Sequence, residues 1–141
     1  MPGHRRALVV DDTEAHRQLM GAILTSQGLE VSFAENGEQA VLAADASAFD
    51  LILMDFQMPV LDGLSATRLV RIHEARRGRA RAMLYIVTTC DRDWMQTRAC
   101  QAGADGYIEK PVDFEQLIRV ARGGALAEEP AAINAPEAAL P

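Results

Sequence analysis

Two hydrophobic patterns alternate along the chain. Short apolar runs without polar alternation, such as residues 51–54, are typical of strands buried on both faces of a parallel sheet. Longer stretches with apolar residues three or four positions apart are typical of amphipathic helices. The runs predict strands at residues 7–10, 30–34, 51–55, 83–87 and 106–108. The spacing predicts helices between residues 13 and 28, over 39–46, 63–76 and 93–102, and between 113 and 123.

Polar residues mark several of the predicted helix ends. Asp62 is a candidate N-cap, and Asp113 with Gln116 has the spacing of a capping box. The stripes expected to face the core are Leu19 with Ile23, then Ala66, Leu69, Val70 and His73, then Thr97, Ala99 and Cys100, and finally Phe114, Leu117, Ile118 and Ala121.

This order of elements predicts the fold class. Strands that alternate with helices indicate an α/β domain with a parallel sheet. Right-handed crossovers then place helices on both faces of the sheet, which makes the fold doubly wound. Ligands of such folds bind outside the carboxyl ends of the strands. The sequence contains no GxGxxG after the first strand and no GxxxxGK[ST], which argues against a nucleotide-binding version.

Length and composition narrow the class of protein. The 141 residues are 49% hydrophobic, enough for one domain with a sizeable core. We expect this domain at residues 5–123 and a flexible tail, rich in Ala, Glu and Pro, at residues 124–141. No apolar run approaches the roughly 20 residues of a membrane span. The start, MPGHRR, has no secretory apolar region and favours a stand-alone protein over a piece of a longer one.

Cysteine content and net charge bear on the compartment and on the class of partner. Two cysteines, Cys90 and Cys100, are too few for a disulfide framework and predict a reduced, cytoplasmic protein. The net charge of −6 argues against direct DNA binding. Thirteen of the fourteen basic residues are arginine, and the group between residues 76 and 81 is predicted to be a solvated loop or a docking patch for an acidic partner.

Candidate chemistry gathers where the predicted strands end. Asp11 and Asp12 follow the first strand, Asp55 ends the third, Thr88 follows the fourth, and Lys110 follows the fifth. Each carboxylate alone would also suit a helix or loop cap. Three carboxylates at one edge repel each other, and an oxygen-only ligand set favours Mg²⁺. A lysine and a hydroxyl beside them suit a small tetrahedral anion, so phosphoryl transfer to an aspartate fits.

Four motifs make the chain recognisable. VVDD, LILMDFQMPVLDG, IVTT and GYIEKP, in this order and spacing, resemble the receiver domain of two-component response regulators. QMPVLDGLSATRLVR is similar to receivers attached to hybrid histidine kinases. The resemblance implies a flavodoxin-like five-stranded parallel sheet of order 2-1-3-4-5 with five helices.

The resemblance also implies a role for each site residue. Asp55 would accept a phosphoryl group from a histidine kinase or a histidine phosphotransfer protein. Asp12, Asp55 and the backbone carbonyl of Gln57 would bind Mg²⁺, with Asp11 acting through water. Thr88 would contact the phosphoryl group, Lys110 would pair with it, and Tyr107 would turn with Thr88 as the switch. Thr88 is favoured over Thr89 by counting back from Lys110.

These features leave several functions open. The first is a phosphorylation-controlled interaction module that is not an enzyme, either on its own or as the receiver of a hybrid histidine kinase. The others are a Mg²⁺-dependent phosphohydrolase and a pseudo-receiver that takes no phosphate. A cap domain for a phosphohydrolase is absent from the sequence, and the complete acidic set argues against a pseudo-receiver.

The signal is expected to leave through the fourth helix, the fifth strand and the last helix. Trp94 lies in the first turn of that fourth helix and is predicted to be partly exposed, on a face for an unknown downstream protein or for a homodimer. His4, His16 and His73 lack partners at metal-ligand spacing and are predicted to be surface residues. Cys90, beside the site, is interpreted as a small filler or a redox sensor.

Overall fold

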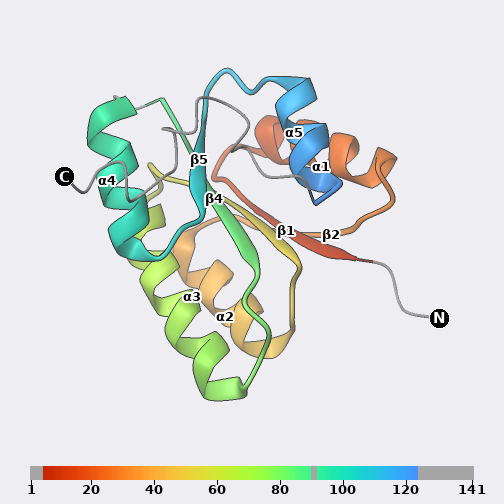
Figure 1. The fold of residues 1–141 in the computed structure, drawn as a ribbon. Coiled ribbons are helices and arrows are strands. Elements are labelled where there is room, and N and C mark those ends of the chain that lie inside the picture. Colours follow the sequence, from red (N-terminus) through yellow and green to blue (C-terminus); the bar gives the residue numbers. More distant parts are fainter. Residues whose placement is uncertain (1–4, 90–91, 124–141) are drawn as a thin grey trace.

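In a computed structural model, which describes residues 5–89 and 92–123, five strands alternate with five helices (Figure 1). The strands are β1 (Arg6–Val10), β2 (Glu30–Ala34), β3 (Leu51–Asp55), β4 (Met83–Thr88) and β5 (Gly106–Glu109). The helices are α1 (Glu14–Ser26), α2 (Gly37–Ala46), α3 (Gly63–Arg77), α4 (Arg92–Ala102) and α5 (Phe114–Ala121). The predicted elements are all present, with bounds shifted by one or two residues. The predicted tail and Cys90 lie outside the described residues.

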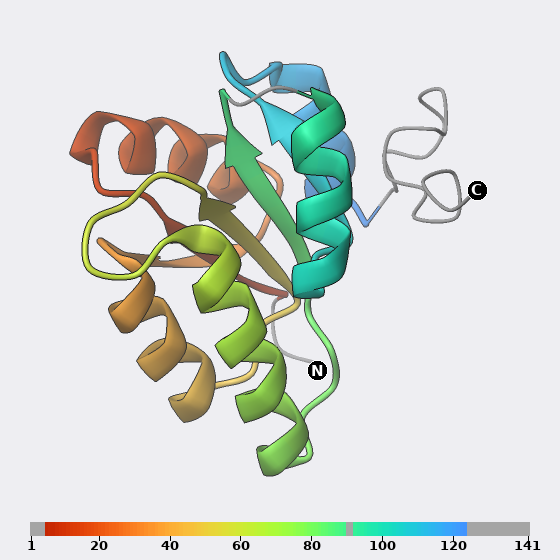
Figure 2. The same cartoon turned by 90° about the vertical axis from the view of Figure 1, so that its left-hand side faces the viewer.

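The five strands form one parallel sheet in the order β2-β1-β3-β4-β5. This confirms the order implied by the resemblance. Because the strands are parallel, all their carboxyl ends lie at the same edge, and the residues that follow β1, β3, β4 and β5 are brought together there. In Figure 2, α3 leads away from this edge, so its last turn and the start of β4 lie at the opposite edge of the sheet.

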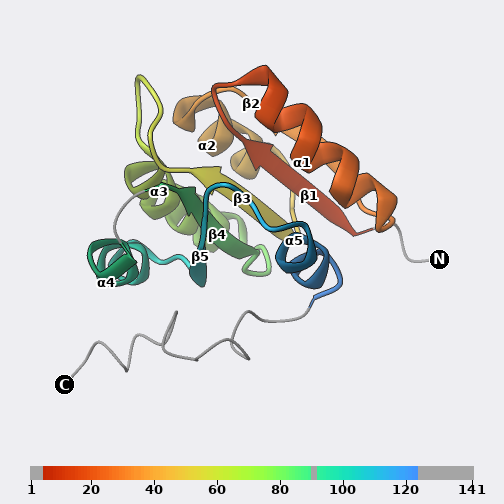
Figure 3. The same cartoon turned by 90° about the horizontal axis from the view of Figure 1, so that it is seen from above.

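Helices cover both faces of the sheet (Figure 3). Along β3, Ile52 and Met54 pack with residues of α2, α3 and α4 on one face, whereas Leu51 and Leu53 pack with residues of α1 and α5 on the other. All five residues of β3 are buried. Burial on both sides explains why residues 51–54 read as an uninterrupted apolar run rather than an alternation.

The predicted helix faces were partly wrong. Leu19, Leu69 and Phe114 are exposed by 46%, 37% and 53%. The prediction is confirmed for Ala66 and Val70 in α3 and for Leu117 and Ala121 in α5, which are all buried. The buried residues that it missed are Met20 and Leu24 in α1, Thr67 in α3 and Val120 in α5. In α4 the exposed Thr97 is replaced in the core by Met95, beside Ala99. Apolar spacing fixes the period of a helix, but which side meets the sheet also depends on buried polar residues that the spacing rule ignores.

Thr67 and Glu74 are two such buried polar residues in α3. The Thr67 hydroxyl donates a hydrogen bond of 2.7 Å to the Gly63 carbonyl, and Glu74 accepts one of 3.0 Å from the Ala82 amide. Both groups are therefore satisfied inside the protein. The predicted N-caps behave as expected: Asp62 accepts from the Ser65 amide at 2.9 Å, and Asp113 caps α5. Among the described residues no helix combines the length and apolar character needed to cross a bilayer.

Candidate functional site

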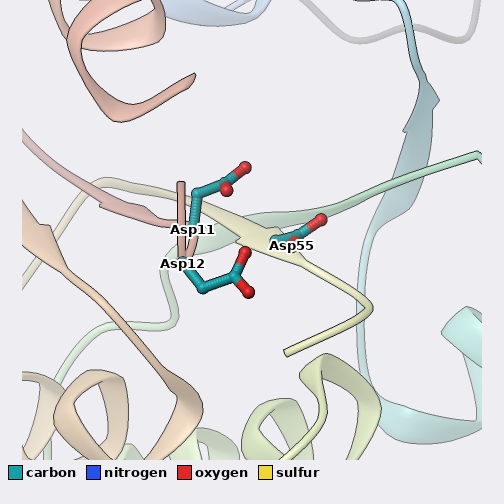
Figure 4. A group of neighbouring side chains, drawn as sticks. All are labelled: Asp11, Asp12 and Asp55. Atoms are coloured by element: carbon teal, nitrogen blue, oxygen red, sulfur yellow. The ribbon is translucent and has the colours of Figure 1, made fainter. Parts of the chain in front are cut away.

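The candidate site is an acidic cluster at the carboxyl edge of the sheet (Figure 4). Asp11 and Asp12 directly follow β1, and Asp55 is the last residue of the neighbouring β3. One carboxylate oxygen from each of the three residues lies within 4.8 Å of the others. The sequence prediction that these carboxylates converge is confirmed. Asp11 and Asp55 are buried while Asp12 is exposed, so the cluster opens to solvent on the Asp12 side.

The loop after β3 is held close to the cluster by two backbone hydrogen bonds. The Phe56 amide donates to the Val87 carbonyl at 3.0 Å, and the Gly63 amide donates to the Phe56 carbonyl at 2.9 Å. A Cβ atom at Gly63 would lie only 2.2 Å from the Asp55 carbonyl oxygen. Glycine at this position therefore allows the first turn of α3 to approach the end of β3, which fixes where Asp55 stands.

Asp11 is the most enclosed member of the cluster, with an exposed fraction of 0%. Its Oδ1 accepts a hydrogen bond of 2.9 Å from the Thr13 amide. Its Oδ2 lies 3.4 Å from Lys110 Nζ and 3.3 Å from His16 Nδ1. The carboxylate is thus oriented by three neighbours before any ligand arrives.

The prediction that the histidines are surface residues is confirmed for His16, whose side chain is 47% exposed, whereas His73 is half-buried, with a side chain 28% exposed. His16 contacts Asp11, and His73 Nδ1 lies 2.8 Å from Asp45 Oδ1. His4 lies outside the described residues. The helical pattern could have suggested the His16 contact, because His16 lies in the first turns of the helix that begins just after Asp11. Spacing rules for metal ligands miss it, since they look only for clusters of ligand residues.

Lys110 contributes a positive charge beside the acidic cluster. Its Nζ lies 3.0 Å from Asp55 Oδ1, and its backbone amide donates to the Thr88 carbonyl at 2.9 Å. Burial by itself would lower the pKa of Lys110, but the hydrogen bond and charge of Asp55, together with Asp11, outweigh burial and raise that pKa. Lys110 is therefore held in its charged form.

The surroundings of Asp55 disfavour its charged form, in contrast to those of Lys110. Burial is the largest influence and raises the pKa of Asp55; the Lys110 hydrogen bond lowers it, and the charges of Asp11 and Asp12 raise it further, so the net pKa is above its usual value. One lysine does not balance three carboxylates. The site carries excess negative charge that an added cation would relieve.

A cavity of about 170 Å³ opens over the cluster. It is lined by Asp12, Asp55, Gln57, Thr88, Thr89 and Lys110. Because the acidic groups offer only oxygen atoms and lie within reach of one ion, the cluster fits a hard divalent cation such as Mg²⁺. The lining also includes the hydroxyl groups of Thr88 and Thr89 and the ammonium group of Lys110. The two threonines differ in burial, since Thr88 is buried and Thr89 is exposed.

The two residues predicted as a switch lie on adjacent strands. Thr88 ends β4, and Tyr107 pairs with Ile86 two residues before it. The exposed fractions of Thr88 and Tyr107 are 2% and 4%, so the Tyr107 ring is turned into the core. The sequence placed Thr88 at the end of the fourth strand and Tyr107 within the fifth, but it could not show the direction of the ring, which depends on the packing between the sheet and α4.

Trp94 is 40% exposed, as predicted. Its ring centroid lies 5.5 Å from that of Phe56, and the Arg98 guanidinium lies 4.7 Å above its ring. Phe56 immediately follows Asp55, so the first turn of α4 is in contact with the loop that leaves the acidic cluster. The sequence pattern does not reveal this contact, because residues 56 and 94 belong to different elements.

The arginine group at the other edge is only partly the solvated loop that was predicted. Arg77 forms two hydrogen bonds with Asp45 at 2.8 and 2.9 Å, and Arg81 pairs with Asp105 at 2.6 Å. Arg79 donates to the Asp45 carbonyl. These side chains connect α2, α3 and the turn before β5, while the side chains of Arg77 and Arg81 remain 55% exposed.

Sequence comparison gives a consistent family. The family model described as "Response regulator receiver domain" matches residues 7–122. The chain is 38% identical over 115 residues to the sensor protein GacS of Pseudomonas syringae, and 36% identical over 118 residues to hybrid signal transduction histidine kinase E of Dictyostelium discoideum. Each match covers 82% of this chain but only 13% and 7% of the two relatives. The chain thus corresponds to a small part of each relative.

Solved structures agree with this family. The magnesium-bound receiver domain of sensor histidine kinase PA1611 from Pseudomonas aeruginosa is 33% identical, with a TM-score of 0.75 over 86% of this chain and 97% of that one. The chemotaxis protein CheY4 of Vibrio cholerae is 27% identical, with a TM-score of 0.78 over 87% and 100%. The receiver of Ssk1 from Saccharomyces cerevisiae, solved with the phosphotransfer protein Ypd1, shares the fold at 24% identity, with a TM-score of 0.79 over 88% and 90%.

Proposed function

Because the chain belongs to the family of response regulator receiver domains, we propose that it takes a phosphoryl group from a phosphohistidine onto Asp55 in a Mg²⁺-dependent reaction. The observation that carries this proposal is the acidic cluster itself. Three carboxylates have oxygens within 4.8 Å of one another, and Lys110 lies 3.0 Å from Asp55. The relatives point to signalling by phosphorelay, either as a separate regulator or as the receiver of a hybrid histidine kinase.

Asp11, Asp12 and Asp55 are the residues that would hold Mg²⁺, together with the backbone carbonyl of Gln57. Asp12 and Gln57 both line the cavity. Burial and the charges of Asp11 and Asp12 raise the pKa of Asp55 despite Lys110, so an added cation would stabilise its anionic form. When bound, the ion supplies positive charge to the phosphoryl oxygens and to the carboxylates. The magnesium-bound PA1611 receiver supports this assignment by similarity.

The transfer step uses Asp55 as the nucleophile. A carboxylate oxygen of Asp55 forms a bond to the phosphorus as the phosphorus–nitrogen bond of the donor phosphohistidine breaks, and the released imidazole nitrogen keeps the bonding electron pair. Lys110 is already charged and hydrogen-bonded to Asp55, so it can pair with a phosphoryl oxygen. The Thr88 hydroxyl donates to another oxygen. Lys110 is in place before the reaction, which lowers the reorganisation that the reaction requires.

The phosphodonor is a histidine kinase or a histidine phosphotransfer protein. An apolar groove of about 160 Å³, lined by Leu19, Met20, Pro111 and Val112, also contains Lys110 and His16. A donor seated on this groove would lie beside the mouth of the acidic cluster. Leu19 is 46% exposed there, and an exposed apolar side chain next to a reactive site suits a protein partner. The Ssk1–Ypd1 complex supports this kind of partner by similarity of fold.

Phosphorylation would change the surface formed by α4, β5 and α5. Thr88 and Tyr107 connect the cluster to this side, and Trp94 is an exposed anchor for an unknown downstream protein or a second copy of the chain. In this proposal residues 5–123 are the signalling unit, the protein acts in the cytoplasm, and it neither binds DNA directly nor turns over an outside substrate.

The proposal is tested by incubation with acetyl phosphate and Mg²⁺ followed by intact mass measurement. One acid-stable, base-labile phosphoryl adduct is expected. Asp55→Asn should remove it, whereas Asp50→Asn, an exposed aspartate at the other end of β3, should keep it. Full labelling of the Asp55 variant would contradict the assignment. Steady turnover of phosphoesters would favour a phosphohydrolase, and no adduct at all would favour a pseudo-receiver.

A further inference from the structure

Arg71, on the side of α3 next to α4, connects three separate parts of the fold. Its Nε donates a hydrogen bond of 2.9 Å to the Gly103 carbonyl, just after α4. Its Nη1 donates to the Ala82 carbonyl, before β4, and to Glu74 Oε1, both at 2.9 Å. Its Nη2 donates to Asp105 Oδ2 at 3.1 Å. Because a guanidinium holds its donors in one rigid plane, this single side chain fixes three backbone segments relative to one another.

The turn between α4 and β5 is built to receive this side chain. Gly103 has a φ of +104°, and a Cβ atom there would lie 3.0 Å from Arg71 Cγ. Arg81 Nη2 donates a second hydrogen bond to the Gly103 carbonyl at 2.9 Å. Asp105 is bound on both sides to Leu84: its amide donates to the Leu84 carbonyl at 2.7 Å, and its Oδ2 accepts from the Leu84 amide at 2.8 Å. The C-terminal end of α4 is therefore attached through several directional bonds.

The burial of this network makes the attachment stiff. The side chains of Arg71, Glu74 and Asp105 are exposed by only 14%, 9% and 16%. Charge-assisted hydrogen bonds are strong in such surroundings and lose much of their strength when a partner moves away. A displacement of the turn would leave buried charges without partners, which is costly.

The first turn of α4 meets the site in a different way. Trp94 contacts Phe56 through their rings, at a centroid distance of 5.5 Å and an interplanar angle of 59°. Contacts between aromatic rings tolerate sliding and tilting more readily than charged hydrogen bonds do. The two ends of α4 thus differ in the kind of contact that holds them, and only the first end lies beside the residue that follows Asp55.

We propose that Arg71 is a positioning residue that clamps the C-terminal end of α4, so that α4 pivots about Gly103 when Asp55 is phosphorylated. The largest displacement then occurs in the first turn, which carries Trp94. The pivot rests on the proposed function, because phosphorylation is its trigger. The clamp acts in the resting protein as well and can be tested without any phosphoryl group.

Two variants weaken the clamp, and a third serves as a control on the same helix. Arg71→Lys keeps the charge but loses the planar set of donors. Asp105→Asn keeps an acceptor for the Leu84 amide but removes the charge that pairs with Arg71. Arg77→Lys removes a similar two-bond contact, in this case with Asp45 of α2. This control variant removes an arginine–aspartate pair between α3 and α2 and leaves the contacts of the turn after α4 unchanged.

The measurement is hydrogen exchange of backbone amides, resolved into residues 92–98 and 99–106, with and without beryllofluoride and Mg²⁺. In the resting protein, we expect exchange over residues 99–106 to be at least about tenfold faster in Arg71→Lys than in the wild type or Arg77→Lys, since local opening there becomes easier. Beryllofluoride should change residues 92–98 most in the wild type. In Arg71→Lys the change should extend to residues 99–106.

Two results would overturn the clamp. The first is an exchange rate over residues 99–106 that, in both Arg71→Lys and Asp105→Asn, stays within about twofold of the rate in the Arg77→Lys control. The other is a wild-type response to beryllofluoride that is largest over residues 99–106. Intact mass after acetyl phosphate, measured on the same samples, separates the two proposals. A wild type without an adduct contradicts phosphorylation of Asp55, and the resting comparison then decides the clamp alone.

Discussion

Two clusters of three carboxylates lie at opposite edges of the sheet, and they differ in charge balance. At the carboxyl edge, Asp11, Asp12 and Asp55 share one lysine. At the other edge, Asp45, Glu74 and Asp105 are paired with Arg71, Arg77 and Arg81. The first cluster raises the pKa of Asp55, while Arg77 and His73 hold the pKa of Asp45 well below its usual range.

This difference separates a functional cluster from a structural one. Asp45, Glu74 and Asp105 are each paired with an arginine, and these ion pairs join α2, α3, β4 and the turn before β5. These carboxylates therefore need no added ligand. The carboxylates at the carboxyl edge repel one another, and an added cation would relieve that repulsion. Electrostatic imbalance in a cavity is a sign of a site, as pKa shifts at functional residues generally show.

The largest expected effect comes from breaking the balanced cluster. Arg71→Ala should lower the free energy of unfolding by roughly 3–5 kcal/mol, because it leaves Glu74 and Asp105 buried without their shared partner. Urea unfolding at neutral pH measures it. Arg68→Ala, on an exposed position of the same helix, is the matched control and should change the free energy of unfolding little. Equal losses in both variants would mean that the network does not carry this stability.

The unbalanced cluster should respond to metal instead. Mg²⁺ at about 100 times its dissociation constant should raise the free energy of unfolding by about 2.7 kcal/mol, because binding to the folded state relieves the repulsion. Asp12→Ala removes an exposed side chain that is proposed to bind Mg²⁺, and it should weaken this response strongly while leaving the core intact. Asp45→Asn should retain it. The measurement is thermal unfolding during a Mg²⁺ titration, with a chelator as control. Equal stabilisation of the wild type, Asp12→Ala and Asp45→Asn would contradict a Mg²⁺ site at the acidic cluster.

The sign of the Asp55 pKa shift gives a further stability prediction. A raised pKa means that the contribution of Asp55 to folding is fully present below its unfolded pKa and is lost as pH rises through the raised value. Without metal at pH 7, Asp55→Asn should therefore stabilise the protein, on the order of 1 kcal/mol because the lost Lys110 hydrogen bond offsets part of the relief. Chemical unfolding in a chelator measures this, and destabilisation would contradict it.

Asp45 should show the reverse pH dependence. Its lowered pKa means that its contribution is present above the unfolded pKa and is lost as pH falls. Asp45→Asn should destabilise the protein at neutral pH, and the difference from the wild type should shrink on acidification. Unfolding curves from about pH 7 down to about pH 3 test the contrast. Parallel pH profiles for Asp45→Asn and Asp55→Asn would remove the distinction between the two clusters.

The carboxyl-edge cluster was far easier to predict from sequence than the balanced one. Asp11, Asp55 and Lys110 each follow a strongly apolar strand, and parallel strands bring their carboxyl ends together without any knowledge of side-chain packing. Arg71 and Asp105 come from a helix and a turn, and their contact depends on how α3 and α4 pack side by side. Part of the buried face of α3 was missed for the same reason, because polar Thr67 and Glu74 are buried by contacts that no periodicity reveals.

The smallest expected effect concerns the contact that connects the functional cluster to the surface. Trp94 is 40% exposed and contacts Phe56, which follows Asp55, so its fluorescence should change when beryllofluoride and Mg²⁺ are added. Trp94→Ala should alter stability by no more than about 1 kcal/mol but should reduce self-association of the activated protein in sedimentation, since exposed Trp residues often anchor interfaces. Phe33→Ala, which removes a 50% exposed aromatic from the edge strand β2, is the control. Unchanged Trp94 emission on activation, together with equal sedimentation of all three activated proteins, would show that the signal does not leave through the first turn of α4.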